Sequence, residues 1–435
     1  MTTLTQDLVQ YIRQKKVSQV DLDQAALFVL DAVASGVAGK RSNAGYILSK
    51  WAGAQGGDAG RQAFLFGALT HILEMDDIHR ASVTHPGCVV VPTALVVGLR
   101  EGSSGHDILH SVLHGYEAMC RVGMAVGQAH YRIWHNTSTC GPFGSAMAAS
   151  TLIQLTDEQA VHALGNAGTQ SSGLWEFNRT GSMSKHMHAG RAVESGITAA
   201  DLAKHGFTGP PQILEGPQGF FAGTCPDAIP EALLNHPSEP WQLTLTSVKP
   251  WPSCRHTHAA IDAALALNKK LDGRDIRKVK VSIYQTVLDV CDQPNPTTDY
   301  QAKFSIYHCV AAALAEGRVE FSSFDEKHRN SLADLRSKVV AEVEEPYASA
   351  YPDQYWGAKV SVTLGDGSII EEERHECKGD PEAALTTDEM ITKAEMLLVH
   401  GGIERADTKS LMDSILNLAQ NRVEHDILEK NILGR

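Results

Sequence analysis

The first half of the chain places apolar residues at helical spacing. Residues 18–21 read Ser-Gln-Val-Asp, a capping-box pattern, and the apolar residues after it recur every three or four positions until Gly36 and Gly39. Similar segments follow at 62–73, 106–125, 144–155, 157–169 and 189–205. They are rich in Ala and Gly, which lets helix axes approach closely, so we predict an all-helical domain over residues 1–245.

The pattern changes after the stretch 237–252, which holds four prolines. Apolar and polar residues alternate at 279–283 and 358–364, as in strands, and the second run leads through Gly-Asp-Gly into another apolar run, which predicts a hairpin. Helical segments at 257–271 and 307–316 lie between these strands. We therefore predict a smaller α+β domain over 250–390 and expect the C-terminal helices, 391–435, to complete the first domain.

Composition narrows the function. The 435 residues carry 38 Lys and Arg against 51 Asp and Glu, a net charge of −13, and an acidic surface repels nucleic acid and anionic lipid. The chain opens without a basic and apolar leader, and the apolar stretch 88–99 is shorter than the about 20 residues that a membrane span needs. The eight cysteines include no C-x-x-C, which argues against a disulfide framework and an iron–sulfur cluster. We expect a cytoplasmic protein with reduced cysteines.

Several common catalytic motifs are absent from the sequence. It contains no G-x-x-x-x-G-K-[ST] phosphate loop, no dinucleotide-binding G-x-G-x-x-G after a strand, no H-E-x-x-H and no G-x-S-x-G. Nucleotide-binding, zinc-protease and α/β-hydrolase functions therefore lose their main support. Clusters of polar residues within apolar helical sequence remain as the candidate sites.

The first cluster holds Glu74, Asp76 and Asp77, followed by His85 and Pro86. Proline disfavours a helix at the preceding residue, so His85 is expected on a turn. The acids are equally typical of a solvated helix end, with Asp76 or Asp77 as a cap. Their spacing to the histidine matches no standard metal site.

The second cluster, 134–141, contains His135 and Thr137 in a hydroxyl-rich run that opens a helix. Helix N-terminal amides can bind a carboxylate, although simple capping by Ser138 or Thr139 explains the same pattern. The third cluster contains Lys185, which is either a surface charge or a buried ammonium with a lowered pKa.

Two further histidines and a proline-rich segment complete the candidates. His186 and His188 resemble a metal pair, but alternate residues on a helix face different sides. Lys249 precedes a proline in a stiff segment that also holds Cys254, which is either a nucleophile or a small buried residue. Tyr307 opens a helix of the smaller domain and fits a core position as well as a site.

Taken together, these motifs resemble the MmgE/PrpD family, which includes 2-methylcitrate dehydratase, cis-aconitate decarboxylase and iminodisuccinate epimerase. The resemblance runs over nearly the whole chain. It is carried by the Asp-Asp run with His85-Pro86-Gly87, by Trp134-His135-Asn136-Thr137 before Gly141-Pro142-Phe143-Gly144, by Ser184-Lys185-x-x-His188-x-Gly190, by Lys249-Pro250-x-Pro252-x-Cys254 and by Ser305-x-Tyr307. Many relatives have Thr after the acid pair, where this chain has Ile78.

The resemblance implies a large all-α helical domain joined to a smaller α+β domain, with the active site between them, in a homodimer that needs neither metal nor other cofactor. It implies a small polycarboxylate as substrate, and the acidic net charge makes nucleic acid and membrane poor candidates as partners. By position in the family's motifs, the catalytic candidates are His85, His135, Lys185 and Tyr307, and the substrate-binding candidates are Glu74, Asp76, Thr137 and Lys249.

The chemistry shared by the family is proton transfer at a carbon next to a carboxylate. Charge develops on that carboxylate, so we expect Lys185, Lys249 and a protonated His135 or His85 to neutralise it while a base takes the proton. We predict a lyase, first a 2-methylcitrate-type dehydratase. The alternatives are an iminodisuccinate epimerase, a cis-aconitate decarboxylase and, in a different class, a non-catalytic polycarboxylate-binding protein.

Overall fold

The computed structural model describes residues 2–54, 58–236, 238 and 240–433. Within the proline-rich stretch, Pro237 lies outside the described residues. The chain divides into two compact units, which are described separately. Unit 1 comprises residues 1–247 and 386–435, and unit 2 comprises residues 248–385.

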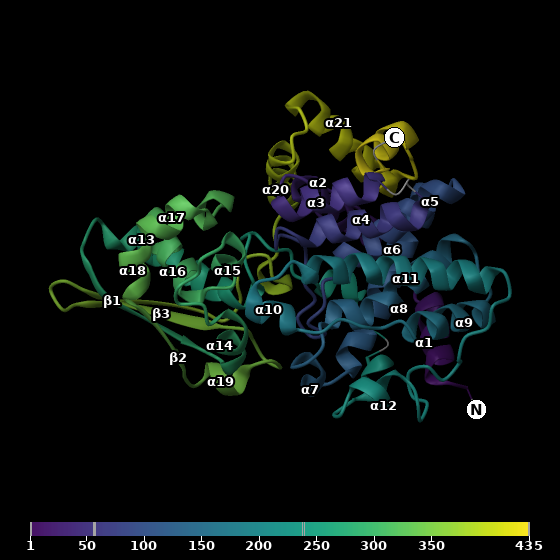
Figure 1. Cartoon of the computed structure of the whole chain (residues 1–435), viewed down its shortest axis with the longest axis horizontal. Coiled ribbons are helices and arrows are strands. Elements are labelled where there is room, and N and C mark those ends of the chain that lie inside the picture. Colours follow the sequence, from purple (N-terminus) through teal and green to yellow (C-terminus); the bar gives the residue numbers. More distant parts are fainter. Residues whose placement is uncertain (1, 55–57, 237, 239, 434–435) are drawn as a thin grey trace. The chain divides into compact units, whose positions relative to one another are not determined.

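Unit 1 is helical. Its main helices are α1 (Leu4–Gln14), α2 (Gln19–Gly39), α3 (Asn43–Ala54), α4 (Ala59–His71), α5 (Gly87–Glu101), α6 (Gly105–Ala125), α7 (Gln128–Tyr131), α8 (Asn136–Leu152), α9 (Asp157–Gly168), α10 (Glu176–Thr180), α11 (Ser184–Lys204), α12 (Phe220–Thr224), α20 (Thr387–His400), α21 (Arg405–Leu416) and α22 (His425–Leu428) (Figure 1). Short 3₁₀ turns lie at Pro230–Leu233, Gln242–Leu245 and Asn417–Gln420. The helices expected from periodicity are present, but α8 starts at Asn136 and continues through Pro142, rather than starting at 144.

The core of unit 1 is built around α8 and α11, which pack along each other and against α4, α5, α6 and α9. Small residues make this close packing possible. A Cβ atom at Gly196 of α11 would lie only 2.3 Å from the Ser145 side chain of α8. The Ala and Gly content of these segments thus has the packing role that the sequence indicated.

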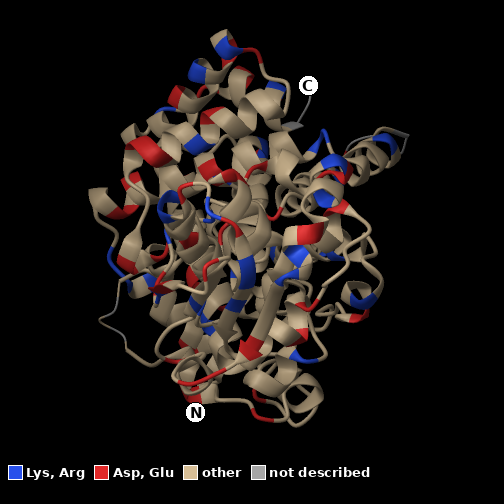
Figure 2. Ribbon diagram, turned by 90° about the vertical axis from the view of Figure 1, so that its left-hand side faces the viewer, with Lys and Arg blue, Asp and Glu red and all other residues tan. Residues whose placement is uncertain are grey.

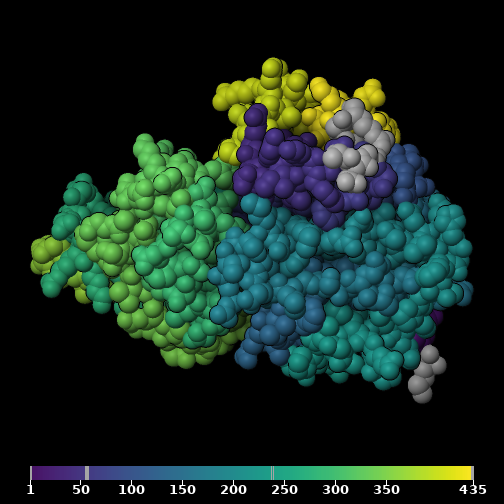
Figure 3. Space-filling view, viewed as in Figure 1, coloured from purple at the N-terminus to yellow at the C-terminus, as the bar shows by residue number. Residues whose placement is uncertain are grey.

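Helix α2 begins with the predicted capping box, in which Ser18 and Asp21 satisfy each other's backbone N–H groups. It is long and apolar enough to cross a bilayer, yet it is buried from Ala25 to Gly39. It packs against α4, and the C-terminal helices α20 and α21 pack against it. Figures 1 and 3 show these yellow C-terminal segments beside the purple N-terminal ones. Helix α2 is therefore a core helix of unit 1.

Unit 2 is built on one four-stranded sheet of order β2-β1-β3-β4. The strands are β1 (Ile276–Ile283), β2 (Val339–Val343), β3 (Ala358–Leu364) and β4 (Ile369–Arg374). Strand β1 runs parallel to β2 and antiparallel to β3, and β3 forms the predicted hairpin with β4. In the hairpin turn Gly367 has a positive φ of 88°, which glycine tolerates. The sequence did not predict strand β2, because its five residues, Val-Val-Ala-Glu-Val, do not alternate between apolar and polar.

Helices α13 (His258–Leu271) and α16 (Ile306–Glu316) pack together and cover the sheet. The shorter helices of unit 2 are α14 (Gln285–Cys291), α15 (Asp299–Lys303), α17 (Glu326–Ser331), α18 (Ala333–Ser337) and α19 (Tyr347–Ala350), with 3₁₀ turns at Arg255–Thr257, Phe321–Phe324 and Pro381–Ala383. Figure 2 shows acidic and basic residues interspersed along the ribbons of the chain. The eight cysteines are all reduced and buried.

Candidate active site

The segment between α4 and α5 is buried although it carries three acids. Asp76 and Asp77 are almost completely enclosed, and Glu74 takes a left-handed backbone conformation with φ of 60°. Non-glycine residues seldom adopt that conformation. A solvated helix end, one of the two interpretations of this cluster, is therefore wrong.

Asp77 holds the start of α5. Its Oδ1 accepts a hydrogen bond from the Gly87 N–H (2.9 Å), and its Oδ2 accepts one from the Tyr116 hydroxyl (2.6 Å). Burial raises the pKa of Asp77 to about 7, with the nearby charge of Asp76 adding to the effect. Asp77 thus plays the capping role that the sequence left open between it and Asp76.

Asp76 faces two histidines. Its Oδ2 lies 2.6 Å from Nδ1 of His71, the last residue of α4, and 3.5 Å from Nδ1 of His85. The His85 Nδ1 also lies 2.6 Å from the backbone carbonyl of Asp77. Since a carbonyl oxygen only accepts, the His85 Nδ1 carries the hydrogen, and a neutral His85 has its lone pair on Nε2. His85 lies outside regular helix, as Pro86 predicts.

Lys185 and Glu74 form a buried ion pair. Lys185 is the second residue of α11 and is 2% exposed, and Glu74 is 1% exposed. The Lys185 ammonium donates to Glu74 Oε1. Of the two roles that the sequence allowed for this lysine, a surface charge is wrong, because the ammonium is enclosed beside a carboxylate.

His135 is the N-cap residue of α8, and its backbone N–H donates to the Gly173 carbonyl (3.0 Å). Its Nδ1 lies 3.3 Å from Nδ1 of His188 in α11. Thr137, in the first turn of α8, accepts a hydrogen bond from the backbone N–H of His85 (3.1 Å). Capping by Ser138 or Thr139 is not observed, because both residues lie inside the helix.

The imidazole rings of His85, His71, His135 and His188 form a continuous row, which we call the histidine row. Ring centroids are 4.7 Å apart between His85 and His71, 5.6 Å between His71 and His135, and 5.5 Å between His135 and His188. Trp175 and Phe177 pack against His135. Helices α4, α8 and α11 and the segment before α5 each contribute to it.

Electrostatics favour the neutral form of two rings in the histidine row, His135 and His188. Burial, reinforced by the surrounding histidines and Lys185, lowers the pKa of His135 well below its ordinary value. The same causes lower the pKa of His188 to about 4. The expectation of a protonated His135 is therefore wrong, and the cation at this site is Lys185.

Lys249 and Tyr307 lie in unit 2. Lys249 is buried. The pKa of His258 is lowered by burial and by the charge of Arg255, and the charge of Lys249 adds to the effect. Tyr307 lies half-buried in the first turn of α16, and its hydroxyl donates to Asp292 Oδ1 (2.7 Å). Burial, together with this carboxylate, raises the pKa of Tyr307.

Cys254 is buried, and burial likewise raises the pKa of Cys309 near it.

Of the eight site residues predicted from the sequence, six belong to unit 1: Glu74, Asp76, His85, His135, Thr137 and Lys185.

Two family models match the chain, the MmgE/PrpD N-terminal domain over residues 6–232 and the MmgE/PrpD C-terminal domain over residues 251–418. The chain belongs to the MmgE/PrpD family. The resemblance stated from the sequence motifs is thereby confirmed.

The curated relatives of this MmgE/PrpD chain have the names of decarboxylases. The chain is 26% identical to the cis-aconitate decarboxylase-like protein oryM of Aspergillus oryzae, over 82% of this chain and 79% of the relative. It is 29% identical to the cis-aconitate decarboxylase of Homo sapiens, over 71% and 66%, and 28% identical to that of Mus musculus, over 76% and 70%. Decarboxylases are lyases, so the prediction that this family member is an enzyme is confirmed.

Sequence reasoning missed two members of the histidine row in this MmgE/PrpD enzyme. His71 ends an apolar helix, and nothing in its surroundings distinguishes it from a core histidine. His188 was considered as half of a metal pair with His186 and as part of the family motif after Lys185, but not as a site residue. In the structure His188 packs against His135 and Phe177. Its spacing of three residues from Lys185, one helical turn, was the available signal.

A buried trio of possible metal ligands, His71, Asp76 and Cys88, was also not predicted. Its donor atoms lie within 4.8 Å of one another. Burial and the adjacent carboxylates raise the pKa of the Cys88 thiol well above its ordinary value. The His71 Nδ1 is hydrogen-bonded to Asp76, so in this structure these two side chains are partners of each other.

Proposed function

We propose that this MmgE/PrpD-family enzyme moves a proton at a carbon next to a carboxylate of a di- or tricarboxylate, and that its reaction is decarboxylation of a cis-aconitate-type substrate. The observation that carries the proposal is the enclosed Lys185 ammonium together with the histidine row. The cation suits a substrate carboxylate, and imidazole rings suit proton transfer.

Lys185 supplies the positive charge. In a decarboxylation the electrons of the breaking C–C bond pass to the substrate, and negative charge develops beside a remaining carboxylate. An ammonium held away from water stabilises that charge far more strongly than one in solvent. Glu74 keeps the ammonium oriented before the substrate binds.

His85 is the proposed proton carrier. The Asp77 carbonyl and the Asp76 carboxylate both face its Nδ1, which leaves Nε2 as the nitrogen that faces the reaction. Nε2 takes a proton from solvent and donates it to the carbon from which CO₂ has left, which returns the ring to its neutral form. Burial lowers the pKa of His135 well below its ordinary value, which suits a role as a hydrogen-bond partner or as a base. Positioned acid–base groups of this kind contribute about 10²–10⁴-fold each.

We place decarboxylation first among the family's reactions because the relatives are named cis-aconitate decarboxylases. The 2-methylcitrate-type dehydratase, which the sequence placed first, has no such support among them. An epimerase needs two proton-transfer groups on opposite faces of one carbon, and the structure of unit 1 gives no reason to prefer that arrangement.

The remaining features of the proposal come from the family resemblance. Lys249 would anchor a distal carboxylate and Tyr307 would serve as an acid. The enzyme would act as a homodimer in the cytoplasm, without a metal or other cofactor.

A screen of carboxylates in D₂O by NMR tests the proposal. A decarboxylase converts cis-aconitate with release of CO₂ and places deuterium on the product carbon. A dehydratase changes the number of hydroxyl groups without releasing CO₂, and an epimerase exchanges one C–H with no net loss. Binding without exchange at any C–H would overturn the assignment to an enzyme of this chemistry.

A further inference from the structure

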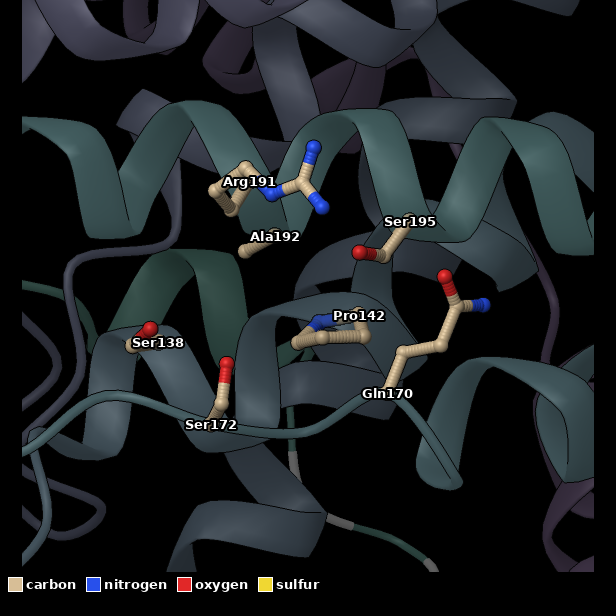
Figure 4. Close-up of a pocket in the computed structure, with 7 residues that line it drawn as sticks. All are labelled: Ser138, Pro142, Gln170, Ser172, Arg191, Ala192 and Ser195. Atoms are coloured by element: carbon tan, nitrogen blue, oxygen red, sulfur yellow. The ribbon is translucent and has the colours of Figure 1, made fainter.

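A polar cavity of about 260 Å³ lies in unit 1 between α8 and α11. It is lined by Ser138, Pro142, Gln170, Ser172, Arg191, Ala192 and Ser195 (Figure 4). Pockets that hold drug-sized ligands measure about 300–1,000 Å³, so this cavity suits a smaller molecule. None of its lining residues belongs to the predicted site.

Two serines with largely buried side chains line the cavity. Ser138 of α8 is 4% exposed and Ser195 of α11 is 7% exposed. Neither hydroxyl has a hydrogen-bond partner among the described residues, and neither oxygen is fully enclosed, so both remain accessible from the cavity. Figure 4 shows both serines at the cavity, so a ligand there can supply the missing partner.

The outer rim carries a cation. Arg191 is 60% exposed at its side chain, and its Nη1 lies 2.5 Å from Glu194 Oε2. Figure 4 shows the guanidinium beside the cavity, with Ser172 and Gln170 across from it. A guanidinium pairs with two oxygens of one carboxylate or phosphate. An exposed ion pair such as that with Glu194 contributes little, so an incoming anion can replace it.

We propose that this cavity is an accessory site for a small oxyanion, either a carboxylate or a phosphate. Arg191 binds the negative oxygens, and the hydroxyls of Ser138, Ser172 and Ser195 complete the coordination. A neutral ligand would leave the guanidinium unused, and a large one would not fit.

The site adjoins the histidine row without sharing residues with it. Ser138 follows His135 by three residues and Arg191 follows His188 by three, about one helical turn in each case. Ser172 precedes Gly173, whose carbonyl holds the His135 backbone N–H. An anion bound to these serines therefore contacts both segments that position His135, which links its binding to the catalytic cluster.

Isothermal titration calorimetry of the full chain at constant ionic strength tests the proposal, with inorganic phosphate and succinate as probes. We expect saturable binding of at least one probe that Arg191→Gln weakens tenfold or more and Ser195→Ala weakens about threefold. Glu194→Gln removes the competing carboxylate and should tighten binding. Arg179→Gln is the matched control, because Arg179 is exposed and pairs with a glutamate at the same i,i+3 spacing outside the cavity.

The two probes separate the two sources of the ligand. Tighter binding of phosphate indicates a phosphate-type ligand, and tighter binding of succinate indicates a carboxylate. Binding that Arg191→Gln and Glu194→Gln leave unchanged would place the anion elsewhere and overturn the proposal, as would no saturable binding of either probe. The measurement needs no turnover, so its result is independent of the reaction proposed above.

Discussion

His71 and Asp76 are hydrogen-bonded across 2.6 Å, and both side chains are completely buried. The pair lies at the centre of the candidate site, since the His71 ring stacks on His135 and meets His85 edge to face. A carboxylate bound to one imidazole nitrogen fixes the tautomer and orientation of the ring. We conclude that the pair orders the histidine row.

His71→Asn tests that role. The asparagine amide can still donate to Asp76, so we expect the variant to fold, but the ring that contacts both neighbouring histidines is lost. We predict a fall in kcat of about 10²-fold with little change in KM. His114→Asn is the control, because His114 lies in α6 outside the site and bonds to Thr151. Equal kcat values in wild type and His71→Asn would remove His71 from the mechanism.

Asp77 should make stability depend on pH. Its folded-state pKa of about 7 lies above the ordinary 3.8, because of burial, so the folded state holds the proton more tightly than the unfolded chain. This contribution to stability is complete below about pH 4 and is lost as the pH rises to about 7. We predict a falling free energy of unfolding over that window, by at most about 1.4 kcal/mol per pH unit from this group.

Asp77→Asn cannot ionise and should remove that part of the slope. Urea denaturation at a series of pH values from 4 to 8 measures it. An unchanged slope in the variant would mean that Asp77 does not titrate in this window.

The buried Lys185–Glu74 pair predicts an asymmetry between single and double variants. Lys185→Met removes the ammonium beside a buried carboxylate, which typically costs about 3–5 kcal/mol. Glu74→Gln in the same chain should restore most of that stability but none of the activity, because the catalytic cation is still absent. Chemical denaturation measures the stability of each variant, and steady-state kinetics measures its activity. Asp201→Asn, which breaks the exposed pair with Arg100, should cost less than about 1 kcal/mol.

A double variant that regained activity would show that Lys185 is not the catalytic cation. Lys185→Ala also leaves Glu74 buried without its partner cation, so that variant should be less stable than wild type as well as inactive.

Tyr307→Phe tests whether unit 2 contributes to catalysis. We predict that it lowers kcat at least tenfold, and that Lys249→Met raises KM more than it lowers kcat, as loss of a distal anchor would. Tyr347→Phe is the matched control, because that hydroxyl also donates to a carboxylate in unit 2, that of Glu373. If Tyr307→Phe and Tyr347→Phe gave the same kcat, Tyr307 would have no role in the reaction.

Much of the fold was predictable from the sequence because its helices and strands follow regular periods. The α2 capping box, the strands β1 and β3 and the β3–β4 hairpin all have local signals. Strand β2 had none, because a short edge strand depends on its pairing with β1 rather than on its own pattern.

The site was predictable in part for a similar reason. His85, His135 and Lys185 stand in recognisable motifs, whereas His71 joins them only through the packing of α4 against α5 and α11. The charge states also depend on tertiary structure. His135 is an ordinary histidine in the sequence, and only its burial among other rings and Lys185 keeps it neutral.

The most direct test of the central proposal is deuterium incorporation in D₂O with cis-aconitate, measured by NMR for the wild type and His85→Ala. We predict that the wild type releases CO₂ and yields a product with deuterium on the carbon that received the proton. His85→Ala, with an unchanged circular dichroism spectrum, should be slower by about 10²-fold or more. Equal rates in the two proteins, or no exchange with any di- or tricarboxylate despite binding, would contradict the proposal.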